Sequence, residues 1–136
     1  DEVAEGRGVE KSALHKVETD LITLDTFIQQ NNIQGIDLMK IDVETHEPEV
    51  FEGFQKHLKA FQPTLLVEII RDNVASSLQN QFSGLDYIFF YINEQFGGKD
   101  EGVDGEIYQK VDTLVGGLFG NYLICSPAKA RELNLI

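Results

Sequence analysis

Residues 36–47 constrain the fold more than any other stretch, because an apolar strand pattern there runs directly into a group of ionisable side chains. Apolar and charged residues alternate along it, which predicts a strand with one apolar and one charged face. The apolar face would carry Met39, Ile41 and Val43, and the charged face Lys40, Asp42 and Glu44. Since open α/β sheets bind ligands at the carboxyl ends of their strands, this pattern predicts a functional site where the strand ends.

The sequence before this strand carries weaker signals. Residues 1–16 are polar and contain glycines, so we expect a loose entry segment there. Residues 17–24 show a weak strand pattern. Asp25 is a residue type that caps helices, and we expect it to begin a short helix over residues 26–32.

The sequence after the strand predicts alternating helices and strands. Pro48 stands where a first helical turn tolerates it, and apolar residues then recur at helical spacing, which predicts a helix of about 13 residues that Pro63 ends. Residues 64–70 form a nearly continuous apolar run, typical of a strand covered on both faces. Asp72 can cap a further helix, which would end near Gly84.

The last third of the chain has a different character. Residues 87–93 and 122–126 are strand-prone with no clear helix between them, and residues 97–105 form a glycine- and acid-rich loop. These features predict an antiparallel strand pair joined by a long excursion. The fold class is therefore α/β, with a mixed, mainly parallel sheet flanked by helices and ending in an antiparallel pair. Residues 1–136 would form a single domain.

Composition narrows the class of function. The net charge of −12 argues against binding to a nucleic-acid backbone or an anionic membrane. No apolar run reaches the roughly 18 to 20 residues needed to cross a bilayer. The single cysteine, Cys125, excludes an internal disulfide and a cysteine-based zinc site, which favours a cytoplasmic location. The chain begins with Asp1 rather than Met, and we expect that it was trimmed from a longer protein.

Four stretches of the chain carry a family resemblance. They are residues 24–28 (LDTFI), 36–47 (IDLMKIDVETHE), 50–53 (VFEG) and 66–68 (LVE). Together they resemble the FkbM family of S-adenosylmethionine-dependent methyltransferases, which are mostly O-methyltransferases acting on natural products and glycans. The resemblance extends from about residue 20 to about residue 95. It implies the Rossmann-like sheet of class I methyltransferases.

The resemblance also implies roles for individual residues. Asp42 would end the fourth strand of the family's sheet, beside the reactive methyl group. Asp42, Glu44 and His46 are then candidates for the base that removes a hydroxyl proton and for the groups that orient the acceptor. Lys40 would steady the acids or polarise the acceptor, and Asp42 and Val43 would contact S-adenosylmethionine. The acceptor would be a hydroxyl of a sugar, glycan or polyketide-like molecule.

Two features depart from the family pattern. The pattern usually has Gly where Thr45 stands, and a β-branched residue there would be strained if positive φ were required. The family's cofactor site also depends on a glycine-rich turn after the first strand and an acid after the second, and this sequence has neither. The chain therefore resembles the C-terminal half of the domain, without its N-terminal strands, and we expect it to be inactive alone. The alternative is a non-catalytic binding or assembly module derived from the same fold.

The ionisable stretch allows two further interpretations. Its acids could be solvated groups at a helix N-terminus, with Lys40 simply paired to Asp42 or Glu44. Alternatively, the side chains of Asp42, Glu44, His46 and Glu47 could hold a divalent cation, although our preferred interpretation assigns no metal ligand.

Other ionisable residues and the sheet edge complete the expectations. Glu68 is either an acid of the pocket or the partner of Arg71. His15 and His57 are expected to face solvent. With the first strands missing, the outer edge of the central strand would be bare, and exposed edges pair with other chains. We expect that edge to be covered, either by residues 17–24 folding back or by a second copy in a homodimer.

Overall fold

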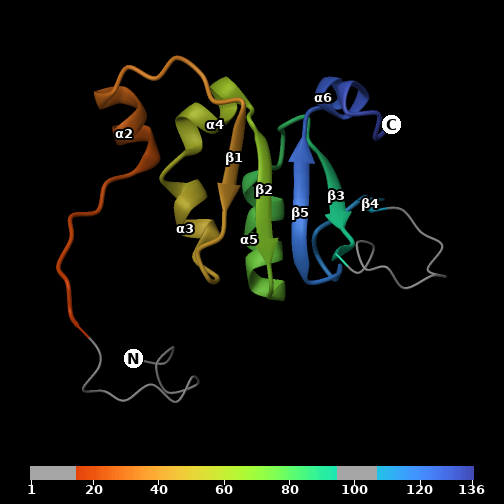
Figure 1. Cartoon of the computed structure of the whole chain (residues 1–136), viewed down its shortest axis with the longest axis horizontal. Coiled ribbons are helices and arrows are strands. Elements are labelled where there is room, and N and C mark those ends of the chain that lie inside the picture. The colour runs from red at the N-terminus through yellow and green to blue at the C-terminus, as the bar shows by residue number, and fades with distance from the viewer. Residues whose placement is uncertain (1–14, 95–106) are drawn as a thin grey trace.

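The computed structural model of the chain describes residues 15–94 and 107–136 and shows a five-stranded open sheet with helices packed on it (Figure 1). In spatial order the strands are β1 (Leu38–Ile41), β2 (Thr64–Ile69), β5 (Gly120–Cys125), β3 (Ile88–Ile92) and β4 (Tyr108–Val111). The pair β1–β2 is parallel, whereas β2–β5, β5–β3 and β3–β4 are antiparallel. The sheet is mixed, as predicted.

The prediction of a mainly parallel sheet is wrong, because three of the four described strand pairs are antiparallel. Strands β1, β2 and β3 do run in the same direction, as their alternation with helices implies (Figure 1). However, β5 lies between β2 and β3 and runs against both of them. The antiparallel pair β3–β5 confirms the prediction for the last third of the chain, and β4 is an additional strand within the excursion. The predicted loop at residues 97–105 lies outside the described residues.

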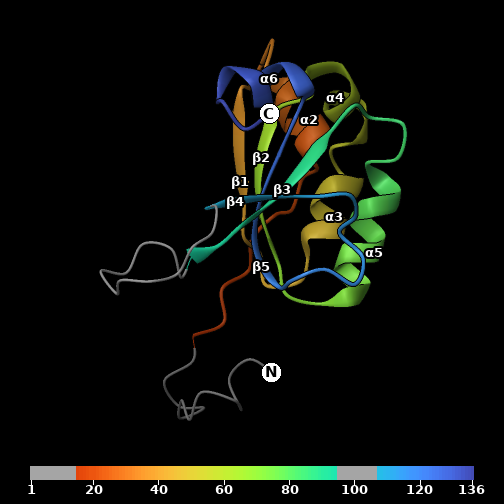
Figure 2. The same ribbon diagram turned by 90° about the vertical axis from the view of Figure 1, so that its right-hand side faces the viewer.

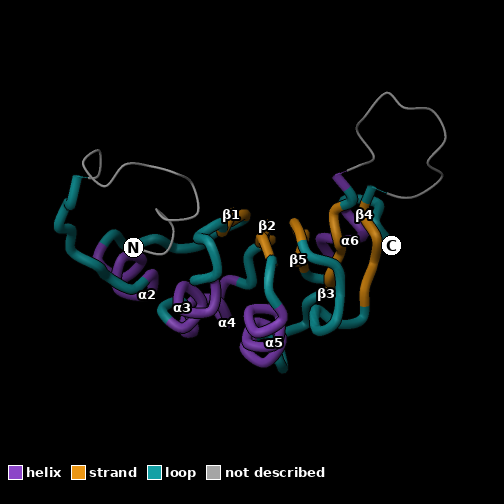
Figure 3. The backbone as a smooth tube through the Cα atoms, turned by 90° about the horizontal axis from the view of Figure 1, so that it is seen from below, coloured by secondary structure: helices purple, strands orange, loops and turns teal. Residues whose placement is uncertain are grey.

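Helices cover the two faces of the sheet unequally. On one face lie α3 (Glu47–Glu52), α4 (Gln55–Phe61) and α5 (Asp72–Gln81), and α2 (Leu24–Gln30) packs beside α4 (Figures 1 and 3). The short helix α6 (Pro127–Glu132) packs on the opposite face, over β3 and β5 (Figure 2). The part of this second face formed by β1 and β2 is therefore more open, which places their outward side chains near solvent.

Alternation along β1 and β2 decides which side chains enter the main core. Met39 and Ile41 face the helices, and Lys40 and Leu38 project from the other side of β1 and are exposed. The same period buries Leu65, Val67 and Ile69 of β2 against Phe51, Leu58 and Leu78 of the helices. The predicted alternation of the central strand is confirmed. The prediction that β2 is fully covered on both faces is wrong, because Leu66 and Glu68 are only half-buried.

The predicted single helix after Pro48 is in fact two helices. Helix α3 ends at Glu52, with Gly53 as its C-cap, and α4 begins at Gln55. Asp25 accounts for the break: its backbone N–H donates to Gly53 O at 2.8 Å, and its carboxylate accepts from the backbone N–H groups of Lys56 and His57 at 3.0 and 3.1 Å. Asp25 therefore caps α4, a helix distant in sequence, rather than its own helix. The N-cap of α2 is Thr23.

The segment before α2 does not form the predicted strand. Residues 15–23 have no regular secondary structure, and the side chains of Val17 and Leu21 are 80% and 92% exposed. Residues 17–24 consequently do not pair with β1 as a strand. Among the described residues, β1 pairs only with β2, so its outer edge has no neighbouring strand. Of the two predicted ways of covering this edge, pairing with a second copy stays a prediction.

No helix among residues 15–94 and 107–136 is long and apolar enough to span a membrane.

Candidate functional site

The carboxyl end of β1 presents the charged face predicted for it. The Lys40 ammonium and the Asp42 carboxylate form an ion pair with Nζ and Oδ2 2.5 Å apart. Both side chains are well exposed, at 60% and 45%. Pairing in solvent contributes little to stability, typically about 0–1 kcal/mol. The pair therefore adds little to the stability of the fold. Its main effect is that the ammonium of Lys40 neutralises one negative charge at the end of the strand.

A tight turn follows β1 and redirects the chain into α3. Its backbone hydrogen bond joins His46 N–H to Val43 C=O at 3.3 Å, and the two central residues, Glu44 and Thr45, have φ values of 54° and 79°. Two consecutive positive φ values are those of a type I′ turn, which favours glycine at its second central position. Thr45 occupies that position, so the strain expected from this departure from the family pattern is present.

Glu47, the first residue of α3, folds back over the turn. Its Oε1 accepts a hydrogen bond from the Val43 N–H at 3.1 Å, so its carboxylate lies at the end of β1. The residue is only 1% exposed, and its Oε2 has no hydrogen-bond partner among the described residues. A buried carboxylate oxygen without a partner is costly, so Glu47 is the one member of this region whose burial calls for a functional explanation.

Glu68 joins this group from the neighbouring strand. Lys40 pairs in register with Leu66 and Ile41 with Val67, so the next positions along the two parallel strands are Asp42 and Glu68. Burial raises the pKa of the Glu68 carboxyl above its ordinary value, and the negative charges of Asp42 and Glu44 raise it further.

Glu47 also raises the pKa of Glu68, and Lys40 opposes these effects. Within the described residues no ion pair joins Glu68 to Arg71, which favours the interpretation of Glu68 as an acid of the site. We call the side chains of Lys40, Asp42, Glu44, Glu47 and Glu68 the strand-end cluster.

Two adjoining hollows lie beside the outer edge of β1. One, of about 360 Å³, is lined by Leu24, Met39, Lys40, Ile41, Asp42, Val43 and Val50. The other, of about 610 Å³, is lined by Leu21, Ile22, Thr23, Leu24, Val43, His46, Glu49, Val50 and Gly53. Because Leu24, Val43 and Val50 line both, we treat the two as one depression and call it the β1-edge groove.

The structure brings together some of the predicted site residues and separates another. Lys40 and Asp42 form an ion pair. The negative charges of Asp42 and Glu44 both raise the pKa of the same neighbour, Glu68. His46 instead lines the far part of the β1-edge groove, where its Nδ1 lies 3.3 Å from Glu44 O. Val43 lies between these two regions, because it lines both hollows.

The prediction that His57 faces solvent is wrong. Its side chain is 12% exposed, and its Nδ1 lies 2.7 Å from Asp25 Oδ1. Burial alone would raise the pKa of Asp25, but the hydrogen bonds from the His57 ring and from the Lys56 and His57 backbones outweigh it and hold the pKa below its ordinary value. This pair joins α2 to α4 and has a structural role. His15 is exposed, as predicted.

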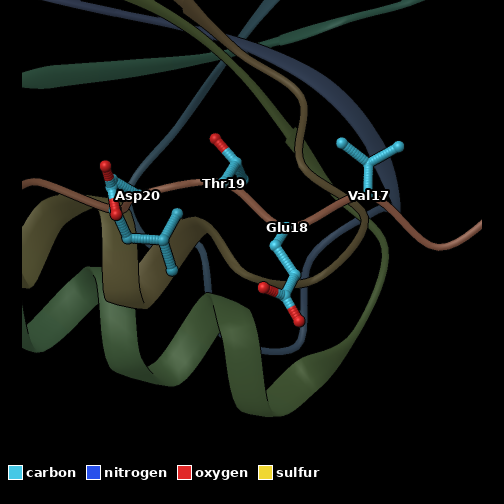
Figure 4. A pocket seen from close by; sticks show the side chains of 5 residues that line it. Val17, Glu18, Thr19 and Asp20 are labelled. Atoms are coloured by element: carbon cyan, nitrogen blue, oxygen red, sulfur yellow. The ribbon is translucent and has the colours of Figure 1, made fainter.

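The segment before α2 offers no comparable site. A hollow of about 760 Å³ lies along residues 17–21, but its side chains alternate along an extended segment, with Val17 and Thr19 on one side and Glu18 on the other (Figure 4). Within the described ranges, no three His, Cys, Asp or Glu side chains are placed to hold a metal ion. The divalent-cation interpretation therefore gains no support from the geometry.

Comparison with known proteins identifies the family. The model of the methyltransferase FkbM domain matches residues 2–97, which is more than half of the chain and contains β1, β2 and the strand-end cluster. No curated protein and no solved structure matches the chain. The family match includes the four stretches that suggested the resemblance. This chain belongs to the FkbM methyltransferase family.

Proposed function

We propose that the chain carries the strand-end site of an S-adenosylmethionine-dependent O-methyltransferase that acts on a hydroxyl of a sugar, glycan or polyketide-like acceptor. One observation supports this proposal above the others. Carboxylates from two neighbouring parallel strands, Asp42 after β1 and Glu68 at the end of β2, lie at the carboxyl edge of the sheet in a member of a methyltransferase family. Open α/β sheets bind their ligands at this edge.

The residues at this edge fit the cofactor in the chemistry of their side chains. The β1-edge groove offers apolar walls from Met39, Ile41 and Val43, with the Asp42 carboxylate at their end. Apolar walls suit a purine ring, and a carboxylate suits a positively charged sulfur. When bound, S-adenosylmethionine would supply an electrophilic methyl group on such a sulfur. Asp42 and Val43 are the residues that we expect to hold it.

Glu68 is the base that the electrostatics favour. Methyl transfer to a hydroxyl requires that the oxygen be aligned and that its proton be removed. A carboxylate whose pKa lies above its ordinary value is a stronger proton acceptor than an ordinary surface acid. In this proposal Glu68 accepts the hydroxyl proton, Asp42 and Glu44 orient the acceptor, and Lys40 steadies Asp42. His46 lines the groove, where it would contact the acceptor without accepting its proton.

The unpaired outer edge of β1 supports the prediction that the family's first strands would belong beside it. The alternative, a non-catalytic binding or assembly module, is favoured by the strained Thr45 at φ 79°. In both cases the chain supplies only part of the contacts that the cofactor needs. We therefore expect weak binding by this chain alone, in the millimolar range.

The test compares S-adenosylmethionine with S-adenosylhomocysteine, which lacks the methyl group and the positive charge on sulfur. Amide NMR shifts of the ¹⁵N-labelled chain would be followed during titration with each ligand. We expect changes at Val43 and Glu68 and a preference for the charged ligand, which Asp42→Asn removes and Glu52→Gln, an exposed control on α3, retains. Micromolar binding would reject the module, whereas absence of any change at 10 mM would contradict the methyltransferase proposal.

A further inference from the structure

The loop that leads into β5 reaches the same edge of the sheet as Glu68. Because β5 runs antiparallel to β2, its first residue lies beside the last residue of β2. Gly120 pairs with Ile69, and Asn121 pairs with Glu68, across a strand spacing of about 4.8 Å. Figure 3 views this edge from below, the side toward which β1 and β2 point in Figure 1. We call residues 112–119 the β5 entry loop; its last residue, Phe119, adjoins this strand end through Gly120.

Contacts at both ends hold the backbone of the β5 entry loop. The Leu114 N–H donates to Gln79 Oε1 of α5 at 2.9 Å, and the Leu114 side chain is buried in the main core. The Tyr122 hydroxyl donates to Leu118 O at 2.5 Å, and Tyr122 is itself fully buried. The other side chains of the loop are therefore presented from an anchored backbone.

The anchored loop exposes three apolar side chains to solvent. Val115, Leu118 and Phe119 are 44%, 53% and 53% exposed, and the residues between them, Gly116 and Gly117, have no side chains. Exposed apolar residues scattered singly over a surface are ordinary, whereas adjacent ones mark a binding surface. Because the backbone is held, these side chains form an apolar surface at the edge of the sheet where ligands bind.

The polar side chains on either side of Glu68 are already paired with one another. On the β1 side, Lys40 forms its ion pair with Asp42. On the β5 side, the Asn121 amide donates to the carboxylate of Glu94, two residues after β3 ends. A sugar ring brings several hydroxyls, each of which needs a hydrogen-bond partner once it is buried. An acceptor with one hydroxyl and an apolar body makes a smaller demand on these groups.

We propose that the acceptor is an alcohol with an apolar body that packs on Val115, Leu118 and Phe119 while its hydroxyl reaches Glu68. This deepens the proposed function, on which it rests for the methylation, and selects the polyketide-like class over sugars and glycans. Sugar hydroxyls placed against these three side chains would lose water without gaining partners.

The order of the strands leaves room for both ligands. The β1-edge groove, to which the cofactor is assigned, lies beside β1, whereas the β5 entry loop leads into β5. Because β2 lies between β1 and β5, Glu68 stands between the two. A hydroxyl held at Glu68 can therefore face the cofactor while the rest of the acceptor lies on the loop.

The test uses two probes that share a six-membered carbon ring, cyclohexanol with one hydroxyl and myo-inositol with six. Each would be titrated into the ¹⁵N-labelled chain and followed by amide NMR shifts. We expect cyclohexanol to bind in the millimolar range and to shift the amides of Glu68, Phe119 and Gly120, and inositol to bind at least tenfold more weakly. The test needs neither S-adenosylmethionine nor turnover, so it can fail while the proposed function stands.

Matched variants test whether the apolar side chains provide the binding. Phe119→Ala and Leu118→Ala should each weaken cyclohexanol binding about threefold to fivefold, because each removes apolar contact area. Both side chains are exposed, so folding should be unaffected, and the bond from Tyr122 to Leu118 O is retained because it involves the backbone. Leu133→Ala, 45% exposed at the C-cap of α6, should leave the affinity unchanged.

Three results would overturn the proposal. Inositol binding as tight as that of cyclohexanol would show that the loop does not select an apolar body. Cyclohexanol shifts that lie around α6 or the β1-edge groove instead of the β5 entry loop would place the apolar site elsewhere. A dimer in sedimentation that Phe119→Ala dissociates would assign the loop to contact between copies of the chain.

Discussion

Replacing Thr45 by glycine tests the local structure that presents the site. Thr45 is the second central residue of the turn between β1 and α3, with φ at 79°. Its hydroxyl makes no hydrogen bond within the described residues, so the substitution removes no polar interaction. The turn itself is retained, because the bond from His46 N–H to Val43 C=O is between backbone atoms.

The expected gain follows from two opposing terms. An L-residue in the left-handed region costs about 1–2 kcal/mol relative to glycine, and a β-branched residue lies at the upper end of this range. Glycine loses more conformational entropy on folding, which offsets about 0.5–1 kcal/mol of the gain. Thr45→Gly should therefore raise the free energy of unfolding by about 1 kcal/mol, which corresponds to about 4 °C in Tm for a chain of this size.

Urea unfolding with equal m values for both proteins measures this difference. Thr19→Gly is the matched control, because Thr19 is exposed and its φ is not positive. That substitution should leave stability unchanged within about 0.5 kcal/mol or lower it. If Thr45→Gly were no more stable than the wild type, the type I′ turn and the strain assigned to Thr45 would be wrong.

Three further substitutions test other parts of the structure. Asp25→Ala should lower the free energy of unfolding by about 2 kcal/mol at pH 7, because α4 loses its cap and His57 its partner. A lowered carboxyl pKa stabilises the fold fully above the ordinary carboxyl pKa and progressively less as the pH falls through the lower folded-state pKa, so a pH series of urea unfolding should show the loss shrinking as the pH falls below about 4. Glu68→Gln should raise Tm at pH 7 but not below about pH 4, since a raised carboxyl pKa destabilises the fold only above its unfolded value. Gly53→Ala should destabilise by about 1 kcal/mol in urea unfolding because its Cβ would lie 3.2 Å from a neighbouring side chain, whereas Gly35→Ala, with nothing within 4 Å, should be neutral. Equal effects of the two alanines, or pH-independent effects of the other two, would contradict these explanations.

Local pattern predicted the elements whose residues alternate or repeat clearly. The period of two in β1 and the inward positions of α5, including Val74 and Leu78, are as expected. The place of β5 between β2 and β3 could not be predicted, because strand order depends on contacts between distant segments. Helix α6 was missed although Ser126 and Pro127 carry an N-cap and first-turn signature that could have found it.

The site shows the same division between local and long-range information. The sequence predicted Lys40 and Asp42 at the end of a strand, because both belong to one short stretch. It does not decide whether Glu68 is an acid of the site or the partner of Arg71. The position of Glu68 beside Asp42 follows from the register of β1 on β2, which is a contact between distant segments. For Asp25, residue type correctly predicted a capping role, but the helix that it caps begins 30 residues later, at Gln55, and only the tertiary structure identifies it.

The most direct test of the proposed site is the pKa of the Glu68 side chain, measured by carboxyl NMR with and without S-adenosylmethionine. We expect a pKa above the ordinary glutamate value in the free chain, because burial and the carboxylates gathered around Glu68 both disfavour its charged form. We expect this pKa to fall when the positively charged ligand binds, because a nearby cation stabilises the carboxylate. An ordinary pKa that does not change on adding the ligand would contradict both the gathering of the acids and their proposed role.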